Sequence, residues 1–301
     1  MRIGRSFKRA KERPTTDGTL LSEVSENVMR LMKELGHSSD LSVRMIESPH
    51  QKSVKAAVIH LDGLADGNII NENIVDPLIQ WFKENNQTLT EMEERASHIL
   101  TVSQVTVKES WQEFLSAVLT GDTVVLLNGS TKAFIASTKS QPSRAITEPT
   151  SQTVIRGPKD SFTENLRTNT SLIRARIQNP DVRLESLKVG SVTQTDIGIM
   201  YIQGIADESI VKEVKKRVQG IDIDGVLESN YIEELIRDDS ATIFPLLLNT
   251  ERPDAVVGNL LEGRVAIIIQ GTPFVLSSRR FFRNFFNLRR TIIKINISVL
   301  F

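Results

Sequence analysis

The residue types that most often carry enzyme chemistry are few in this chain and poorly spaced. The chain has no cysteine, which excludes a thiol nucleophile and cysteine-based zinc or iron–sulfur sites. Its four histidines, His37, His50, His60 and His98, form no close pair and no H-E-x-x-H motif. No G-x-S-x-G or G-x-G-x-x-G sequence is present. We therefore expect no catalytic site, no metal site and no cofactor.

Charged residues at the expected ends of strands and helices are the candidates for binding a small molecule. Asp62 and Asp66 follow a predicted strand, where ligands often bind in α/β sheets, although helix capping or turn formation is the favoured explanation. The four candidates for lining a cleft are Arg144, Arg156, Arg252 and Asp254. Arg252 and Asp254 flank Pro253, so the charge preference of a helix start also explains this pair. The sequence leaves these alternatives open.

Two other charged motifs have competing interpretations. The sequence DIDG at 222–225, followed by Glu228, resembles part of a calcium loop. It lacks the third acidic position and the twelve-residue span, so a tight turn is favoured. Arg167, Arg174 and Arg176 lie on one predicted helix. A solvated helix face is the favoured interpretation, and an anion or subunit contact is the alternative.

Two separated matches indicate that the chain contains a duplicated unit. VIHLDGLAD at 58–66 matches IMYIQGIAD at 199–207, and SAVLTGDTVVLLNGS at 116–130 matches GNLLEGRVAIIIQGT at 258–272. The matches align three pairs of glycines: Gly63 with Gly204, Gly121 with Gly263, and Gly129 with Gly271. The separation in sequence is nearly the same for the two matches. We therefore predict two copies of about 100 residues each.

Each copy is predicted to have the order β-α-β-α-β-β. In the first copy we expect strands at 55–61 and 99–107, a helix at 110–119, and a hairpin of 123–127 with 133–136. Four apolar residues at four-residue spacing predict the helix after the first strand: Ile70, Ile74, Leu78 and Phe82. In the second copy we expect strands at 197–202 and 243–249, a helix at 253–261, and a hairpin of 265–269 with 273–276. The helix after the first of these strands carries Ile210, Val214 and Val218 on one face.

These elements predict an α/β fold with two similar subdomains, each a small mixed β-sheet packed with helices, joined by a linker and a bridging helix. A capping-box pattern of Ser161 and Glu164 predicts that the bridging helix begins there. The expected boundaries are a basic leader with a first helix (1–44), an N-terminal subdomain (45–145), linker and bridging helix (146–180), a C-terminal subdomain (181–285) and a tail (286–301).

Composition limits the classes of partner. The chain has 301 residues, with 37 Lys and Arg against 37 Asp and Glu, so its balanced charge favours no nucleic-acid partner. Residues 1–13 carry six basic residues against one acidic residue, a net charge of +5, which is typical of a solvated leader or of an arm near anionic lipid. No stretch reaches the roughly 20 apolar residues that a spanning helix needs.

Several long blocks of the sequence resemble one protein family, and they occur in the same order as in that family. They are WQEFLSAVLTGDTVVLLNG (111–129), EPTSQTVIRGPKDSFTENLRTNTSLIRARI (148–177), YIQGIAD (201–207), IDIDGVLESNYIEELI (221–236) and FPLLLNTERPDAVVGNLLEGRVAIIIQGTPFVL (244–276). The chain is similar to the N-terminal soluble region of A subunits of spore germinant receptors, the GerA family, over about residues 45–280. After about residue 280 it departs from the family pattern. The tail is then interpreted as a non-native end of a truncated chain.

The resemblance implies a non-enzymatic membrane complex of A, B and C subunits in the inner membrane of spores, which senses nutrients and starts germination. It implies that this region lies on the cytoplasmic side, that other A subunits are partners, and that the missing C-terminal region meets the membrane. Our leading hypothesis is a non-catalytic module for receptor assembly and signal coupling. The alternative is a germinant-binding module that holds a small molecule between the two subdomains.

Overall fold

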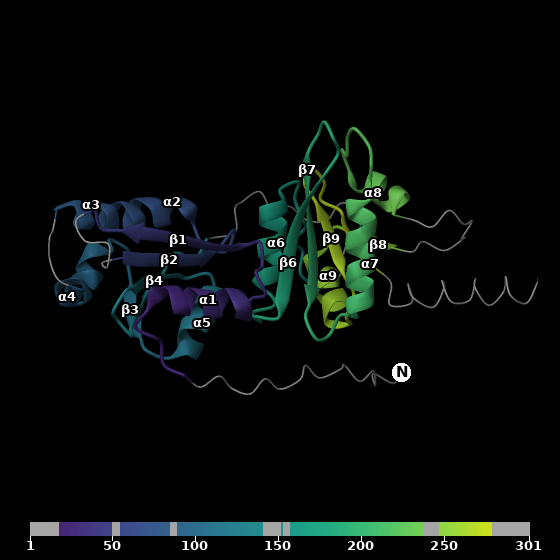
Figure 1. Ribbon diagram of the computed structural model, residues 1–301. Helices are drawn as coiled ribbons and strands as arrows, with labels where there is room; N and C mark the ends of the chain where they lie inside the picture. Colours follow the sequence, from purple (N-terminus) through teal and green to yellow (C-terminus); the bar gives the residue numbers. More distant parts are fainter. Residues whose placement is uncertain are drawn as a thin grey trace, which may run out of the picture. The chain divides into compact units, whose positions relative to one another are not determined.

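The computed structural model describes residues 18–49, 55–84, 89–140, 152, 157–236 and 247–278. Residues 1–17 of the predicted leader, most of the Pro-rich linker and the predicted tail lie outside the described residues. Contacts within the chain divide the described residues into two compact units, drawn in Figure 1. The N-terminal unit contains described residues of 18–140 and 170–183, and the C-terminal unit contains those of 152–169 and 184–278.

The N-terminal unit is built around a five-stranded sheet in the order β1-β2-β4-β5-β3. Its elements along the chain are α1 (Val24–Glu34), β1 (Leu41–Glu47), β2 (Lys55–Leu61), α2 (Gly67–Ile70), the π-helical turn η1 (Asn71–Val75), α3 (Asp76–Glu84), α4 (Leu89–Ile99), β3 (Val105–Lys108), α5 (Trp111–Leu119), β4 (Thr123–Leu127) and β5 (Ala133–Ala136).

The second copy repeats this plan in another five-stranded sheet, in the order β6-β7-β9-β10-β8. Its elements are α6 (Leu166–Arg174), β6 (Val182–Val189), β7 (Thr195–Ile202), α7 (Glu208–Gln219), α8 (Ser229–Leu235), β8 (Leu247–Thr250), α9 (Pro253–Leu261), β9 (Ala266–Ile269) and β10 (Val275–Ser278). Because both sheets place their five strands in the same relative order, the predicted fold class of two similar α/β subdomains is confirmed.

The direction of the strands differs from the expected mixed sheet. All four strand pairs of the first sheet run antiparallel, as do β7 with β9, β9 with β10 and β10 with β8 in the second. The sheets are antiparallel because each copy begins with a strand that the sequence analysis did not predict. β1 and β6 precede the first predicted strands, and β1 forms an antiparallel pair with β2 over its full length. β3 does not join β2 as a parallel neighbour, since it lies at the far edge beside β5.

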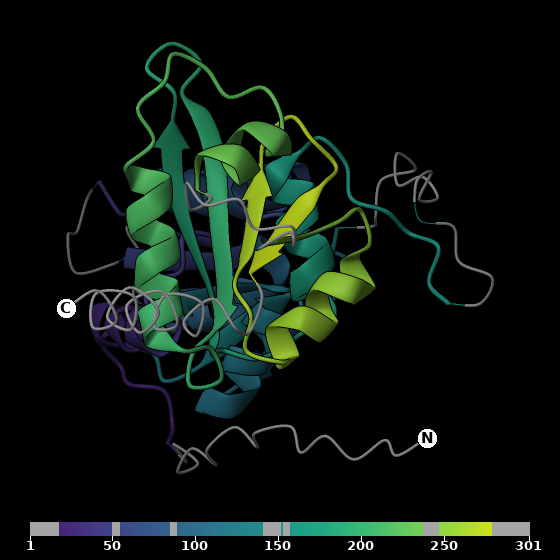
Figure 2. The same cartoon turned by 90° about the vertical axis from the view of Figure 1, so that its right-hand side faces the viewer.

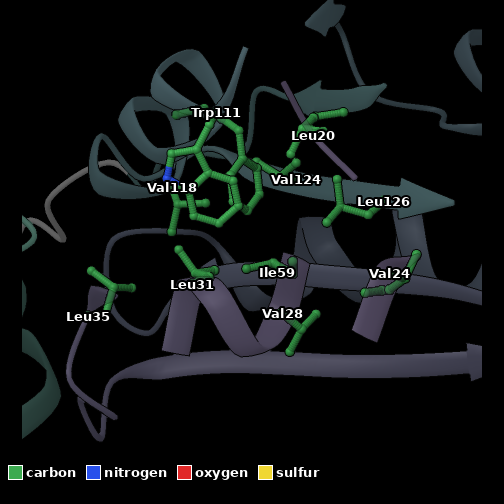
Figure 3. Packing of buried hydrophobic residues seen from close by; sticks show 14 of the residues in the cluster. Leu20, Val24, Val28, Leu31, Leu35, Ile59, Trp111, Val118, Val124 and Leu126 are labelled. Atoms are coloured by element: carbon green, nitrogen blue, oxygen red, sulfur yellow. The ribbon is translucent and has the colours of Figure 1, made fainter. Parts of the chain in front are cut away.

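Two hydrophobic layers cover the two faces of the first sheet. Neighbouring residues on the central strands alternate between the layers: Val58 packs with the cluster that includes α2, α3 and α4, whereas Ile59 packs with α1 and α5. Figure 3 shows the second layer, in which Leu31 of α1 and Trp111 of α5 enclose Ile59. This burial on both faces explains why the central strands are apolar throughout.

The second sheet is covered in the same way. α7 and α8 contribute Val214 and Ile232 to one core cluster, against Ile199 and Ile267 of the sheet. Figure 2 looks onto this face. On the opposite face, the α-carbon of Gly198 lies so close to Leu184 and Leu166 that an added Cβ would come within 3.0 and 3.3 Å of their side chains. Leu166 belongs to α6, so this helix lies on the opposite face, and α9 contacts β7, β9 and β10 of the same sheet.

The helices after β2 correspond only in part to their predictions. The four residues at four-residue spacing are all buried, as expected of one helical face: Ile70, Ile74, Leu78 and Phe82. The helix is interrupted by the π-helical turn η1, which the spacing does not indicate. The predicted strand at 99–107 is wrong at its start, because α4 extends to Ile99 and the strand itself covers only Val105–Lys108.

The aligned glycines have the same conformation in both copies. The backbone φ angles are +82° and +81° for Gly63 and Gly204, +92° and +84° for Gly121 and Gly263, and +94° and +95° for Gly129 and Gly271. At Gly121 a Cβ would lie 3.0 Å from the carbonyl oxygen of Leu64, and at Gly263 2.7 Å from that of Ile205, the aligned residue. The repeat therefore extends to the same close backbone contact.

Substituting Gly121 tests this contact. Gly121→Ala places a Cβ at a positive φ against a backbone carbonyl, and we expect it to lower the free energy of unfolding by about 1–3 kcal/mol. Gly67→Ala is the matched control, because nothing lies within 4 Å of the added Cβ at this helix start, and stability should be unchanged or slightly higher. Urea unfolding followed by the fluorescence of Trp81 and Trp111, both in the N-terminal unit, measures the difference. Equal stability of the two variants would contradict the prediction.

Candidate functional site

A buried asparagine fixes the start of each copy. In the first copy, Asn27 accepts a hydrogen bond from the backbone N–H of Leu21 (3.0 Å) and donates one to its carbonyl (2.6 Å). In the second, Asn169 makes the same two bonds with Thr163, at 2.7 and 2.6 Å. These residues have the same separation in sequence as Gly121 and Gly263, so α6 is the first helix of the second copy as α1 is of the first.

The hairpin turns complete these helix starts. The side-chain oxygen of Asn128 accepts from the N–H of Val24 at 3.1 Å, and that of Gln270 accepts from the N–H of Leu166 at 2.8 Å. Each bond satisfies a backbone donor that a helix start leaves free. α6 therefore begins at Leu166, and the predicted capping box is wrong, because Ser161 donates instead to the carbonyl of Glu251 at 3.0 Å.

One position on α6 breaks the symmetry between the copies. Continuing the alignment of α1 with α6 places Met32 opposite Arg174. Although Arg174 ends the first helix of the second copy, its contacts assign it to the N-terminal unit together with residues 170–183. The side chain of Arg174 is only 1% exposed, so the predicted solvated face is wrong for this residue. Arg167 and Arg176 of the same predicted face are exposed.

Arg174 forms a buried ion pair with Asp40, whose side chain is 3% exposed. Its Nε lies 2.8 Å from Asp40 Oδ2 and its Nη2 lies 3.0 Å from Oδ1, which is a two-point contact between guanidinium and carboxylate. Ser38 bridges the pair: its hydroxyl donates to Asp40 Oδ1 at 2.7 Å and accepts from Arg174 Nη2 at 2.9 Å. We call Ser38, Asp40 and Arg174 the buried arginine cluster.

A second arginine packs beside the loop that carries this cluster. A Cβ built on Gly36 would collide with Nε of Arg183, so the side chain of Arg183 lies directly against the backbone of Gly36. Gly36 also has a φ of +60°, which favours glycine. The turn between α1 and β1 is therefore shaped to receive two arginines from the segment at 170–183.

The predicted acids at the strand-to-helix turns act as helix caps or strand-end partners. Asp66 accepts from the N–H groups of Asn68 (2.9 Å) and Ile69 (3.3 Å) at the start of α2. Asp207, its aligned counterpart, accepts from the N–H of Ser209 at 2.9 Å. Asp62 lies 3.5 Å from Nε2 of His60. These contacts agree with the capping alternative for Asp66.

The predicted cleft residues are only partly described. Arg144 and Arg156 lie outside the described residues. Arg252 and Asp254 form an ion pair at the start of α9, with 3.1 Å between Nε and Oδ1 and a second contact from Nη2 to Oδ2. Their side chains are 25% and 28% exposed. The geometry brings these two residues together and places Asp254 in the first helical turn, as the helix-start interpretation expects.

The DIDG sequence at 222–225 is a turn that bonds to the β6–β7 hairpin. Asp224 accepts from the hydroxyl of Ser191 at 3.0 Å, and its carbonyl accepts from the N–H of Val192 at 2.8 Å. The tight-turn interpretation agrees with these bonds. Among the residues that the structure describes, no three His, Asp or Glu side chains are placed to hold a metal ion.

The described surface offers little that resembles a reaction centre. A groove of about 140 Å³ on the C-terminal unit is lined by Tyr201, Gln203, Ala206, Glu208, Val211, Lys212 and Lys215. An open groove of about 800 Å³ on the N-terminal unit is lined by Gly18, Thr19, Val107, Lys108, Glu109, Ser110 and Glu113. Hydrogen bonds from Ser25 and Lys55 lower the pKa of Glu23, and a hydrogen bond to Glu93 raises the pKa of Lys132. Both are surface groups without the environment of a general acid or base.

Most of the chain matches one known protein family. The family described as "Bacillus/Clostridium GerA spore germination protein" matches residues 29–289. The chain belongs to this GerA family. The predicted resemblance to germinant receptors is therefore confirmed.

Several GerA relatives match nearly the whole chain. Spore germination protein KA of Bacillus subtilis (strain 168) is 45% identical over 276 residues, which are 92% of this chain and 50% of that protein. Spore germination protein B1 of the same organism is 35% identical, over 85% of this chain and 52% of that protein. The chain thus spans about half the length of the curated relatives it matches. These relatives are named as germination proteins and not as enzymes.

A solved structure matches the fold as well. The crystal structure of the N-terminal domain of the A subunit of the Bacillus megaterium spore germinant receptor GerK3 is 36% identical, with a TM-score of 0.69. The match covers 89% of this chain and 98% of that one. Within the described part of this GerA family member, no helix has both the length and the hydropathy required to span a bilayer.

The buried arginine cluster is the feature that the sequence predictions missed. One signal was available: the repeat aligns Arg174 with Met32, and a charge replacing a methionine marks a position with a new polar partner. The partner Asp40 is 134 residues away from Arg174, so local spacing carries no information about it.

Breaking the cluster should destabilise the N-terminal unit. Arg174→Met restores the residue of the first copy but leaves the carboxylate of Asp40 buried without its cation, at a cost of about 3–5 kcal/mol. Adding Asp40→Asn removes that charge, so the double variant should recover part of the loss. Urea unfolding monitored by Trp111 fluorescence measures both. Arg176→Met, an exposed residue on the same segment, is the control and should cost less than about 1 kcal/mol. A similar loss in the control would contradict the role of burial.

Proposed function

We propose that this chain is the N-terminal domain of a germinant receptor A subunit, and that it acts without catalysis in receptor assembly and signal coupling. The partners in this proposal are the B and C subunits, other A subunits, and the membrane through the remainder of the A subunit. The proposed location is the cytoplasmic side of the spore inner membrane. Membership of the family and the match to a receptor A-subunit domain support the role in germination.

The observation that supports signal coupling is that the first residues of α6 belong to one unit and its last residues belong to the other. Its first turn is bonded within the C-terminal unit, where Leu166 donates to Gln270 and Asn169 bonds to Thr163. Its last residue, Arg174, is paired with Asp40 within the N-terminal unit. A single helix thus begins in one unit of the duplicated structure and ends in the other. A displacement of one end is transmitted along a hydrogen-bonded helix rather than lost in a loop.

Germination assays test signal coupling directly. An A subunit of full length carrying Arg174→Met together with Asp40→Asn, which leaves no unpaired buried charge, should be produced and reach the membrane, while the rate of nutrient-triggered germination falls by about tenfold or more, since a coupling energy of about 1–3 kcal/mol corresponds to about 5–150-fold. Arg176→Met is the matched control and should germinate normally. Subunit abundance by immunoblotting separates loss of signalling from loss of protein. Normal germination with the double variant at normal abundance would refute the proposal.

A second proposed function is direct binding of a nutrient. The pair Arg252 and Asp254 presents adjacent opposite charges that are about a quarter exposed, which complements a zwitterion such as an amino acid. Asp62, Asp66, Arg144 and Arg156 were also predicted as ligand contacts, and they remain predictions for the same ligand.

Calorimetry with a panel of nutrients tests binding. A ligand that binds the intact chain should lose at least about tenfold in affinity when Arg252 and Asp254 are both replaced by Ala. The matched control is the pair Arg264 and Glu262, which has the same sequence spacing in the same unit, with 2.8 Å between Nη2 and Oε2. Absence of heat with every nutrient at millimolar concentration, or an equal loss in the control variant, would refute this function.

A further inference from the structure

One end of the C-terminal unit exposes large apolar side chains on a rigid frame. Val192, at the tip of the β6–β7 hairpin, is 76% exposed, and Leu227, just before α8, is 67% exposed. Tyr231 and Leu235 are also exposed and continue from Leu227 at four-residue spacing, so they lie along one side of α8. We call Val192, Leu227, Tyr231 and Leu235 the apolar tip. Figure 1 shows the hairpin and the loop before α8 rising together at this end of the unit.

Hydrogen bonds hold the two loops of the tip in one conformation. Ser191 and Val192 donate their backbone N–H groups to the carbonyls of Ile223 (2.9 Å) and Asp224 (2.8 Å). Thr195 donates its hydroxyl to the carbonyl of Val226 at 2.7 Å. The apolar side chains are thus presented by a fixed backbone, which lowers the entropy cost of binding a partner.

Glycines are needed for this close packing of the loops. A Cβ on Gly190 would lie 2.5 Å from the hydroxyl of Thr193, and one on Gly225 would lie 2.8 Å from the methyl group of Thr193. Neither distance is compatible with a larger residue in the same geometry. The loops are therefore shaped around Thr193, while Val192 next to it remains exposed.

The segment that carries three of the four residues of the apolar tip has charge of one sign. The segment 221–236 contains five acidic residues and no basic residue: Asp222, Asp224, Glu228, Glu233 and Glu234. Two basic residues on neighbouring elements already have acidic partners, since Lys188 pairs with Asp196 at 3.1 Å and Arg217 pairs with Glu213 at 2.8 Å. An exposed apolar stripe bordered by carboxylates complements an amphipathic segment bordered by Lys or Arg, and repels an anionic lipid surface.

The last described strand, β10, ends at the end of the sheet opposite to the apolar tip. β7 begins beside the tip, and its first part pairs with the end of β9, as Ile197 with Ile269. Further along, Met200 pairs with Ala266, and Ala266 pairs with Ser277 of β10. The end of β10 at Ser278 therefore lies away from the tip.

We propose that the apolar tip is a docking surface for a basic amphipathic segment of another protein chain. The contact combines burial of Val192, Leu227 and the apolar side of α8 with pairing of the acidic residues to Lys or Arg. This inference goes beyond the proposed coupling function, because it concerns a surface that contains no part of the buried arginine cluster.

Binding of two synthetic peptides tests the docking surface. An amphipathic helix of Leu and Lys, labelled for fluorescence anisotropy, should bind the 301-residue chain, and the same helix with Glu in place of Lys should not. The double variant Val192→Ser, Leu227→Ser should weaken binding by about tenfold or more, because it removes the two most exposed apolar contacts. Leu261→Ser, which changes an exposed leucine at the end of α9, is the matched control and should bind as the unchanged chain does.

Three results of the peptide assay would overturn the proposal: no binding of the Lys peptide at millimolar concentration, equal binding of the Glu peptide, or equal binding by the double variant. Cosedimentation with phosphatidylglycerol vesicles that depends on Val192 and Leu227 would also overturn it, in favour of a lipid surface. The thermal midpoint of the double variant should equal that of the unchanged chain, because neither side chain is buried. These measurements use no spores, so docking and signal coupling can fail independently.

Discussion

The pairing of Arg174 with Asp40 is the constraint on which the organisation of this chain depends. A guanidinium and a carboxylate that are both almost completely buried are stable only together, because either one alone would leave a charge without solvent or partner. The pair joins residues 134 positions apart and commits the segment at 170–183 to the N-terminal unit. The first helix of the second copy is therefore fixed at its end by a residue that belongs to the first copy.

Duplication explains why this pair stands out. The bonds at Asn27 and Asn169, and the caps from Asn128 and Gln270, are repeated with the same geometry, because both copies must satisfy the same backbone groups at the start of the first helix. Arg174 has no such counterpart, since Met32 occupies the aligned position. Repeated interactions therefore serve the fold of each copy, and the unrepeated one decides to which unit the end of α6 belongs.

Much of the fold could be predicted from the sequence, because the elements are encoded locally. The hairpin at 123–127 and 133–136 and the helix at Pro253–Leu261 have their predicted bounds, since Asn-Gly and N-terminal proline act within a few residues. The strand β1 was missed because its mostly half-buried or exposed positions lack a clear alternation, and β6 was missed because its apolar residues at 182, 184, 187 and 189 do not keep one two-residue period. The buried arginine cluster was missed because an exposed and a buried arginine look the same on a helix, and only a distant aspartate decides between them.

The contrast between the buried arginine cluster and the apolar tip also has a physical basis. The cluster contains paired charges out of contact with water, which suits a permanent connection, because removing one partner costs about 3–5 kcal/mol. The apolar tip has the opposite character: apolar groups are left in water, and the carboxylates of 221–236 have no basic residue within that segment. Removing these apolar groups from water lowers the free energy, and this requires a second molecule that covers them. The two kinds of contact lie on different elements, so the docking proposed for the apolar tip needs no residue of the buried arginine cluster.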